Sequence, residues 1–173
     1  MTSITQQTWN KVASLYLEKF EDVSEYAIAL DRFCDLIPTG EPTLLEIGCG
    51  PGNLTKYIHN KRRDIQITAI DYAANMIELA KQQVPAADFR VMDAMEIMQL
   101  NKSFDAILCG FCLPYLEMAA VEKLFSYFMK LLKGNGIVYC SFIEGDYALS
   151  GYKTASTGDE AYVYYFSEAQ IAN

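Results

Sequence analysis

The feature that most constrains the fold is an apolar run that ends in closely spaced glycines, Leu44-Leu45-Glu46-Ile47-Gly48-Cys49-Gly50-Pro51-Gly52. Its apolar part is typical of a strand buried inside a parallel sheet. The glycines allow a tight turn and a close approach of the backbone to a ligand, because no Cβ stands in the way. A helix expected from about Asn53 would present unpaired N–H groups at the same place. A strand, a glycine-rich turn and a helix in this order predict a nucleotide-cofactor site in a doubly wound α/β fold.

Strands and helices are expected to alternate along most of the chain. Apolar residues at helical spacing predict two helices before the first strand, in residues 5–20 and 22–37. The pattern then predicts strands at 43–47, 65–70, 87–92, 104–109 and 137–143, helices at 53–60, 73–83 and 117–132, and a turn at 133–136. Such alternation indicates a Rossmann-like, mainly parallel sheet with right-handed crossovers.

The pattern changes after residue 143. Residues 145–160 contain three glycines among serine, threonine and aspartate, which predicts a mobile loop. Residues 161–166 are tyrosine-rich and strand-like, and Ser167 is a predicted N-cap of a helix from Glu168. We interpret the 173 residues as a single domain. Its expected parts are a helical cap (1–40), a cofactor-binding core (41–143) and a lid-like, shortened C-terminal part (144–173).

Charge and composition exclude several functions. The formal net charge is −8 at pH 7, whereas nucleic-acid binders need a basic face. No apolar run has the length of a membrane span, and the first ten residues lack the features of a secretory signal. Five cysteines, an odd number, lie mostly in apolar surroundings and predict reduced thiols in a cytoplasmic protein. We therefore expect a small-molecule partner, with no nucleic acid and no membrane.

Aspartates follow the second and third predicted strands. Asp71 lies at the tip of strand 65–70, where a carboxylate can accept hydrogen bonds from both ribose hydroxyls of an adenosine. Asp93 follows strand 87–92 and could accept a hydrogen bond from an adenine amino group. Either aspartate could instead cap the helix that follows it.

Taken together, these segments resemble the class I S-adenosylmethionine (SAM) methyltransferases. The pattern E-x-G-x-G-x-G at 46–52, the two aspartates, SFDAILCG at 103–110 and LLKGNGIVYCSF at 131–142 are each similar to segments of that family. The resemblance covers about residues 9–143 and points to the small-molecule type with an N-terminal helical cap. It implies SAM as the cofactor.

The resemblance also implies a set of cofactor-binding residues. The glycines would line the methionine and ribose, Glu46 would orient the cofactor, often through water, and Asp71 would bind the ribose. Tyr72 and Met76 would pack against the adenosine, and the segment from Asp93 would surround the adenine. The full set is Glu46, Gly48, Cys49, Gly50, Gly52, Asp71, Tyr72, Met76, Asp93, Ala94, Met95, Cys109 and Gly110.

The acceptor and any catalytic residue are not evident in the sequence. The run Leu113-Pro114-Tyr115-Leu116 stands where many relatives have a histidine, so no base is predicted there. Tyr16 and Tyr115 are the residues that we expect on the acceptor side. Cys109 and Cys112 have the spacing of metal ligands, but the chain has one histidine, His59, and no second cysteine pair. No metal site is therefore predicted.

Methyl transfer to a small-molecule acceptor by in-line displacement is the function that these residues favour. A non-catalytic SAM-binding or regulatory protein would keep residues 44–95 and lose the acceptor pocket. A dinucleotide oxidoreductase is disfavoured, because Pro51 and Asn53 do not fit the pattern G-x-G-x-x-G. An aminopropyl transferase would need an acidic polyamine site, and nothing in the sequence resembles one.

The end of the sheet carries a further expectation. In the family, a helix and antiparallel strands follow the fifth strand, whereas this chain ends before them. Strand 137–143 is apolar, and an open edge of this kind can pair with other chains. We expect either that residues 161–166 fold back onto the sheet or pair with a second copy in a homo-oligomer, or that further strands of a longer protein complete the sheet.

Overall fold

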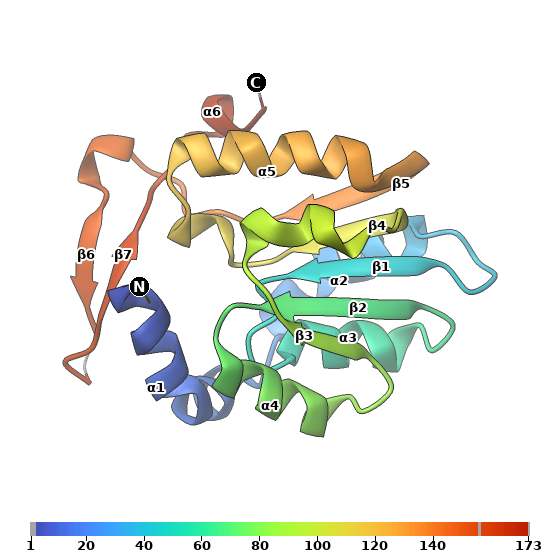
Figure 1. The fold of residues 1–173 in the computed structure, drawn as a ribbon, viewed down its shortest axis with the longest axis horizontal. Helices are drawn as coiled ribbons and strands as arrows, with labels where there is room; N and C mark the ends of the chain where they lie inside the picture. Colours follow the sequence, from blue (N-terminus) through green and yellow to red (C-terminus); the bar gives the residue numbers. More distant parts are fainter. Residues whose placement is uncertain (1–2, 156, 173) are drawn as a thin grey trace.

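The computed structural model describes residues 3–155 and 157–172, and a five-stranded parallel sheet forms its centre (Figure 1). The strand order is β3-β2-β1-β4-β5. The strands are β1 (Thr43–Ile47), β2 (Gln66–Asp71), β3 (Asp88–Val91), β4 (Phe104–Cys109) and β5 (Leu132–Cys140). All four pairings are parallel, and the order reverses between β1 and β4. The predicted Rossmann-like sheet is confirmed, and its switch point is where such sheets bind ligands.

Helices cover both faces of the sheet, because successive strand residues point to opposite sides. Leu44 faces a core formed with α2 (Ala27–Leu36), α3 (Asn53–Lys61) and α4 (Ala74–Gln83). Leu45 faces a second core formed with η2 (Ala94–Leu100), α5 (Met118–Leu131) and Phe166. In Figure 1, α5 lies beside β5 at the top of the view and α4 beside β3 at the bottom.

The N-terminal helix α1 (Ile4–Phe20) begins after Ser3, whose side chain accepts a hydrogen bond from the Gln6 N–H. The short 3-10 helix η1 (Ser24–Tyr26) connects α1 to α2, so the two predicted N-terminal helices are confirmed. Only Ala13 of α1 is fully buried, and it packs with Ala73 and Met76 of the α4 region. α1 therefore lies against α4 rather than on a face of the sheet, as Figure 1 shows.

The segment 133–136, predicted as a turn, is part of β5 but leaves the ladder. Phe104 pairs with Leu132, and Ala106 pairs with Ile137. The four residues 133–136 therefore lie opposite Asp105 alone, as an irregularity in the pairing. β5 and β3 are the edge strands of the sheet, and an oligomer through the β5 edge stays a prediction.

The prediction that 145–160 is a loop is wrong for residues 147–149, 151–154 and 160. The 3-10 helix η4 (Tyr147–Leu149) is followed by β6 (Gly151–Thr154), which pairs with β7 (Glu160–Val163) as an antiparallel hairpin. Tyr152 lies opposite Tyr162, with ring centroids 5.2 Å apart, and such cross-strand aromatic pairs stabilise a hairpin.

Residues after β7 form an isolated bridge with the segment that follows β5. The Phe166 N–H donates to the Ile143 carbonyl (3.0 Å), and the Gly145 N–H donates to the Phe166 carbonyl (3.1 Å). The predicted strand at 161–166 thus splits between the hairpin and this bridge. Helix α6 (Glu168–Ala172) follows with Ser167 as its cap, as predicted. Within the described residues, no helix has the length and apolarity that a bilayer crossing requires.

Candidate functional site

A cavity of about 1120 Å³ lies at the carboxyl ends of β1, β2 and β4. Two parts of its wall can be distinguished. The cofactor half comprises the lining residues within 46–54, 70–76 and 92–94, together with Gly110. The acceptor half comprises the lining residues of α1, of 111–116 and 141–144, and of the β6–β7 hairpin.

The three glycines of the β1–α3 turn have different surroundings. All three have positive φ values, which favour glycine. A Cβ on Gly48 would lie 2.8 Å from the Cβ of Cys112, and one on Gly52 would lie 3.2 Å from Cα and Cβ of Ala80. A Cβ on Gly50 would have only a Tyr16 ring atom nearby, at 4.0 Å. Gly48 and Gly52 therefore permit close packing, while the space in front of Gly50 belongs to the cavity.

Glu46 is a buried carboxyl group in the floor of the cofactor half. It is 1% exposed, and the Thr55 hydroxyl donates to its Oε2 at 2.6 Å. Burial raises the pKa of Glu46 to about 8, and the Thr55 hydrogen bond opposes that rise. Without a cationic ligand, Glu46 is mostly protonated at pH 7.

Asp71 connects the end of β2 to the glycine turn. Its Oδ2 accepts from the Gly50 N–H at 2.9 Å, and its Oδ1 accepts from the Ala73 N–H at 2.8 Å. Burial raises the pKa of this carboxyl, and the two backbone hydrogen bonds oppose the rise. Asp71 thus fixes the turn before α4, whose N-cap is Ala73, and also lines the cavity, where each oxygen keeps a lone pair for a ligand hydroxyl.

Asp93, in the segment after β3, caps the following helix and also lies at the cavity. The Asp93 side chain accepts from the Met95 N–H at 2.8 Å and so caps η2. Asp93 and Ala94 also line the cavity. The Met95 side chain instead packs against the second core.

Most of the predicted site residues line this one cavity. They are Glu46, Gly48, Cys49, Gly50, Asp71, Tyr72, Met76, Asp93, Ala94 and Gly110, with Tyr16 and Tyr115 on the acceptor side. Gly52, Met95 and Cys109 are outside its lining. Cys109 is fully buried in β4, where hydrogen bonds with Cys112 and Cys140, together with burial, raise the pKa of its thiol. The contact of each residue with SAM stays a prediction.

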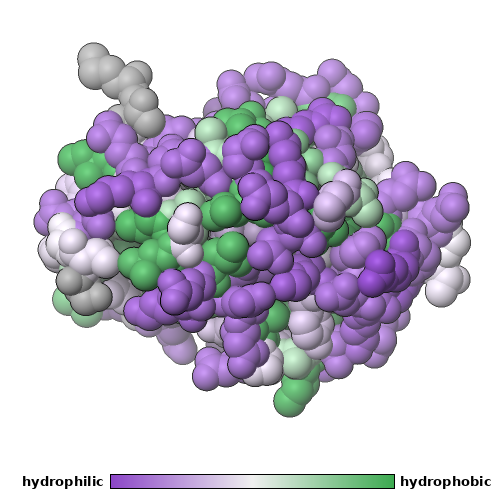
Figure 2. Space-filling model, turned by 90° about the horizontal axis from the view of Figure 1, so that it is seen from below, coloured by the Kyte–Doolittle hydropathy of each residue, from purple (hydrophilic) through white to green (hydrophobic). Residues whose placement is uncertain are grey.

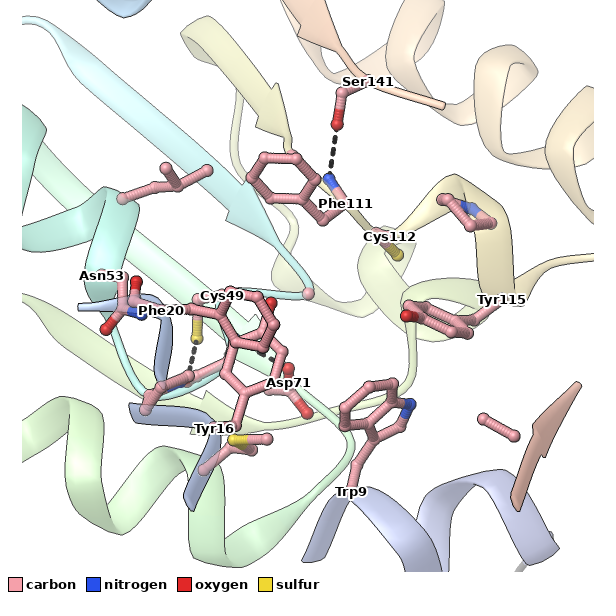
Figure 3. Close-up of a pocket in the computed structure, with 18 of the residues that line it drawn as sticks. Trp9, Tyr16, Phe20, Cys49, Asn53, Asp71, Phe111, Cys112, Tyr115 and Ser141 are labelled. Atoms are coloured by element: carbon pink, nitrogen blue, oxygen red, sulfur yellow. Dashed lines mark hydrogen bonds between the residues drawn. The ribbon is translucent and has the colours of Figure 1, made fainter. Parts of the chain in front are cut away.

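An aromatic wall, formed by Trp9, Tyr16 and Tyr115, dominates the acceptor half (Figure 3). The Trp9 ring centroid lies 5.0 Å from that of Tyr115 and 5.5 Å from that of Tyr16, both edge to face. The structure therefore brings together the two predicted tyrosines, from helix α1 and from the loop after β4. Sequence reasoning missed Trp9, although it lies two helical turns before Tyr16 on the same face of α1.

Phe111 is a second missed residue of this half. Its φ of +60° is unusual for a non-glycine residue, and its N–H donates to the Ser141 Oγ at 2.7 Å. Figure 3 shows this hydrogen bond between the loop after β4 and the end of β5. The bond holds the loop in the conformation that lines the cavity.

Helix α1 is anchored to both halves. Toward the cofactor half, the Gln6 Nε2 donates to the Tyr72 carbonyl (2.8 Å), and the Asn53 Nδ2 donates to the Phe20 carbonyl (2.6 Å). Toward the hairpin, the Thr8 Oγ1 donates to the Glu160 carbonyl (2.6 Å). Figure 2 views the molecule from below Figure 1, and hydrophobic surface gathers on the half of that face where α1 and the hairpin lie.

The tyrosines of the aromatic wall stay protonated at neutral pH. Burial raises the pKa of Tyr16 to about 12, with further contributions from Tyr26 and Asp71. Burial also raises the pKa of Tyr115. Both phenols can therefore form hydrogen bonds, but neither is a base. Among the described residues, no histidine lines the cavity, and no group of histidine, cysteine or acidic side chains has the arrangement of a metal site.

Comparison with known proteins identifies the family. The family model described as a methyltransferase domain matches residues 44–136, more than half of the chain. The chain belongs to the class I SAM-dependent methyltransferases. A malonyl-[acyl-carrier protein] O-methyltransferase of Acetivibrio thermocellus is 36% identical over 139 residues, which are 78% of this chain and 47% of the relative. The chain spans between about a third and a half of the length of the curated relatives compared.

Solved structures agree with the fold. The DhpI–SAH complex superposes with a TM-score of 0.76 at 19% identity, covering 98% of this chain and 82% of DhpI. The plantazolicin methyltransferase BamL, in complex with SAH and a triazolic desmethylPZN analogue, has a TM-score of 0.67 at 26% identity. That match covers 82% of this chain and 56% of BamL. SAH is S-adenosylhomocysteine, the product form of SAM.

The residues present fit SAM as the cofactor. Gly50 leaves space that a side chain would fill, at the start of α3. Asp71 offers carboxylate oxygens beside it, and Glu46 lies in the floor. These groups suit the ribose hydroxyls and the positive charge of SAM.

Proposed function

We propose that this protein transfers the methyl group of SAM to a small-molecule acceptor by in-line displacement. The observation that carries the proposal is the continuity of the cavity, which joins the glycine turn to the aromatic wall. A volume of about 1120 Å³ exceeds the usual range for a single small-molecule ligand, roughly 300–1,000 Å³. The cavity therefore has room for a cofactor and an acceptor together.

The protein's own contribution would be position and exclusion of water. SAM supplies, when bound, a methyl group on a positively charged sulfur. Gly50 would admit its methionine part, and Asp71 would fix its ribose. Trp9 and Tyr115 would hold the acceptor in line with the methyl group and keep water out of the reaction path. The paired strands β6 and β7 would cover this half as a lid.

A non-catalytic SAM-binding protein is the alternative that was open from the sequence. Such a protein has no need of space beyond the cofactor, whereas the acceptor half here is wide and largely apolar. This difference favours the enzyme. A small acceptor also agrees with the net charge of −8, which disfavours nucleic acid. The five free thiols support the expectation of a cytoplasmic location.

Two measurements test the proposal. Calorimetry with SAH should show one site per chain, and NADH should not compete. Labelled methyl groups from SAM should then enter a metabolite extract with the wild type but not with Gly50→Val, whose side chain would fill cofactor space. Tight SAH binding without any transfer would leave only the non-catalytic alternative.

A further inference from the structure

The charges that line the cavity are unevenly distributed. Six carboxyl groups line it, against two lysines, and the described lining has no arginine. Both lysines make contacts with groups outside the aromatic wall. The Lys153 Nζ lies 3.4 Å from the Leu149 carbonyl and over the Tyr165 ring, and the Lys19 Nζ lies over the Phe20 ring. An acceptor carboxylate placed here would lose water and meet an excess of carboxyl groups over lysines, which costs free energy.

The aromatic wall favours a positively charged acceptor over a negatively charged one. Faces of Trp and Tyr rings attract cations, more strongly where water is excluded. Trp9, Tyr16 and Tyr115 all line the cavity, and Asp159 of the hairpin lies on the same side. Asp159 is held by Lys11 at 2.6 Å, so a free cation would be recognised mainly by the rings.

The acceptor half has few candidate bases, namely the carboxyl groups of Glu144 and Asp159. An alcohol, phenol or thiol acceptor must lose its proton to become a good nucleophile, and enzymes usually supply a side chain for this step. Here the phenols stay protonated, and no histidine is present in the described lining. An amine differs, because its ammonium form can release a proton to water and then attack with a nitrogen lone pair.

From these three observations we infer that the acceptor is an amine, recognised in its ammonium form by the aromatic wall of Trp9, Tyr16 and Tyr115. The inference rests on the proposed methyl transfer and names its substrate class. In the reaction, the lone pair of the neutral amine forms the new nitrogen–carbon bond. The carbon–sulfur bond breaks, its electron pair stays on sulfur, and the resulting methylammonium can release a proton to water.

A binding experiment isolates the recognition of positive charge. Choline and 3,3-dimethylbutan-1-ol have the same shape and differ in charge, because carbon replaces the quaternary nitrogen. Both would be titrated by calorimetry into the protein saturated with SAH. We expect choline to bind at least about tenfold more tightly, which is 1.4 kcal/mol. Trp9→Leu should abolish most of that preference, and Tyr115→Phe, which keeps the ring, should retain it.

The matched control is Tyr152→Leu, which removes an exposed tyrosine of the hairpin outside the cavity. It should keep the preference for choline. Equal binding of the two probes, stronger binding of the alcohol, or no binding of either would overturn the aromatic wall as an ammonium site.

The chemistry of the labelled product separates this inference from the proposed function. The extract would be methylated with labelled SAM, treated with alkali and passed over a cation exchanger. N-methyl groups survive alkali and are retained as cations, whereas methyl esters release labelled methanol. Retained label in excess of a protein-free sample with the same SAM is the expected result. Labelled methanol or a neutral labelled product would preserve methyl transfer and refute the amine, and no label at all, with SAH binding intact, would refute both.

Discussion

The two halves of the cavity are built in different ways. In the cofactor half, Gly50 and Asp71 lie at the carboxyl ends of adjacent strands and are joined by a backbone-to-carboxylate hydrogen bond. In the acceptor half, Thr8 bonds to Glu160, 152 positions away in the chain. The first half depends on local strand–turn–helix geometry, and the second depends on the docking of remote segments. Cofactor binding should therefore tolerate changes in the acceptor half, and the predictions below test this independence.

The largest effect is expected at the glycine that faces the cavity. Gly50→Val should weaken SAH binding by about 100-fold or more, because the new side chain occupies ligand space. Gly40→Val is the matched control, since Gly40 also has a positive φ and open surroundings but is outside the cavity. Calorimetry of both variants would separate ligand exclusion from backbone strain. Equal losses in the two variants would show that strain alone explains the effect.

The next largest effect is expected at the ribose carboxylate. Asp71→Ala should weaken SAH binding by about 30-fold, or about 2 kcal/mol, because a charge-assisted acceptor is lost. Asp146→Ala removes a similar carboxylate, which accepts from the Ala148 N–H at 2.9 Å outside the cavity. SAH affinity should be unchanged in that control. Unchanged affinity in Asp71→Ala would remove this residue from the cofactor site.

A pH effect on stability is expected from Glu46. Its pKa is about 8 in the folded protein and near 4.5 in the unfolded chain, so between these values the folded state binds the extra proton. The contribution of Glu46 to stability is therefore present at low pH and is lost as pH rises toward about 8. Denaturant unfolding without ligand should show a steeper decline from about pH 5 to 8 in the wild type than in Glu46→Gln. If the free energy of unfolding fell equally with pH in both proteins, Glu46 would not have the raised pKa that the structure gives it.

The smallest effect is expected where α1 meets the hairpin. Thr8→Val removes the hydroxyl that donates to Glu160 and should destabilise this docking by about 1 kcal/mol. Hydrogen exchange of the Tyr162 amide, which donates to the Thr5 hydroxyl, should become faster, while SAH affinity stays constant. Ser126→Ala, which removes an exposed hydroxyl of α5, is the control. A parallel fall in SAH affinity in Thr8→Val would mean that the two halves are not independent.

The contrast between the local geometry of the cofactor half and the remote contacts of the acceptor half explains which features the sequence could predict. Gly48, Gly50 and Asp71 were predictable because strand, turn and carboxylate lie close together in the chain and in the fold. The meeting of Trp9 with Tyr115 was not, since it depends on how α1 docks against a loop more than 100 residues later. The hairpin was missed because the glycines and polar residues of 145–160 resemble a loop, whereas pairing of Tyr152 with Tyr162 supplies the strand contacts.

Methyl transfer and SAH binding measured together in Trp9→Leu test the division of the cavity most directly. The variant removes one aromatic ring of the acceptor half and no residue that lines the cofactor half. Labelled SAM with a metabolite extract would report transfer, and calorimetry would report SAH affinity, with circular dichroism as the check of folding. We expect SAH affinity within about threefold of the wild type and transfer reduced at least about tenfold. Wild-type transfer, or a loss of SAH affinity that matches the loss of transfer, would contradict two separate halves.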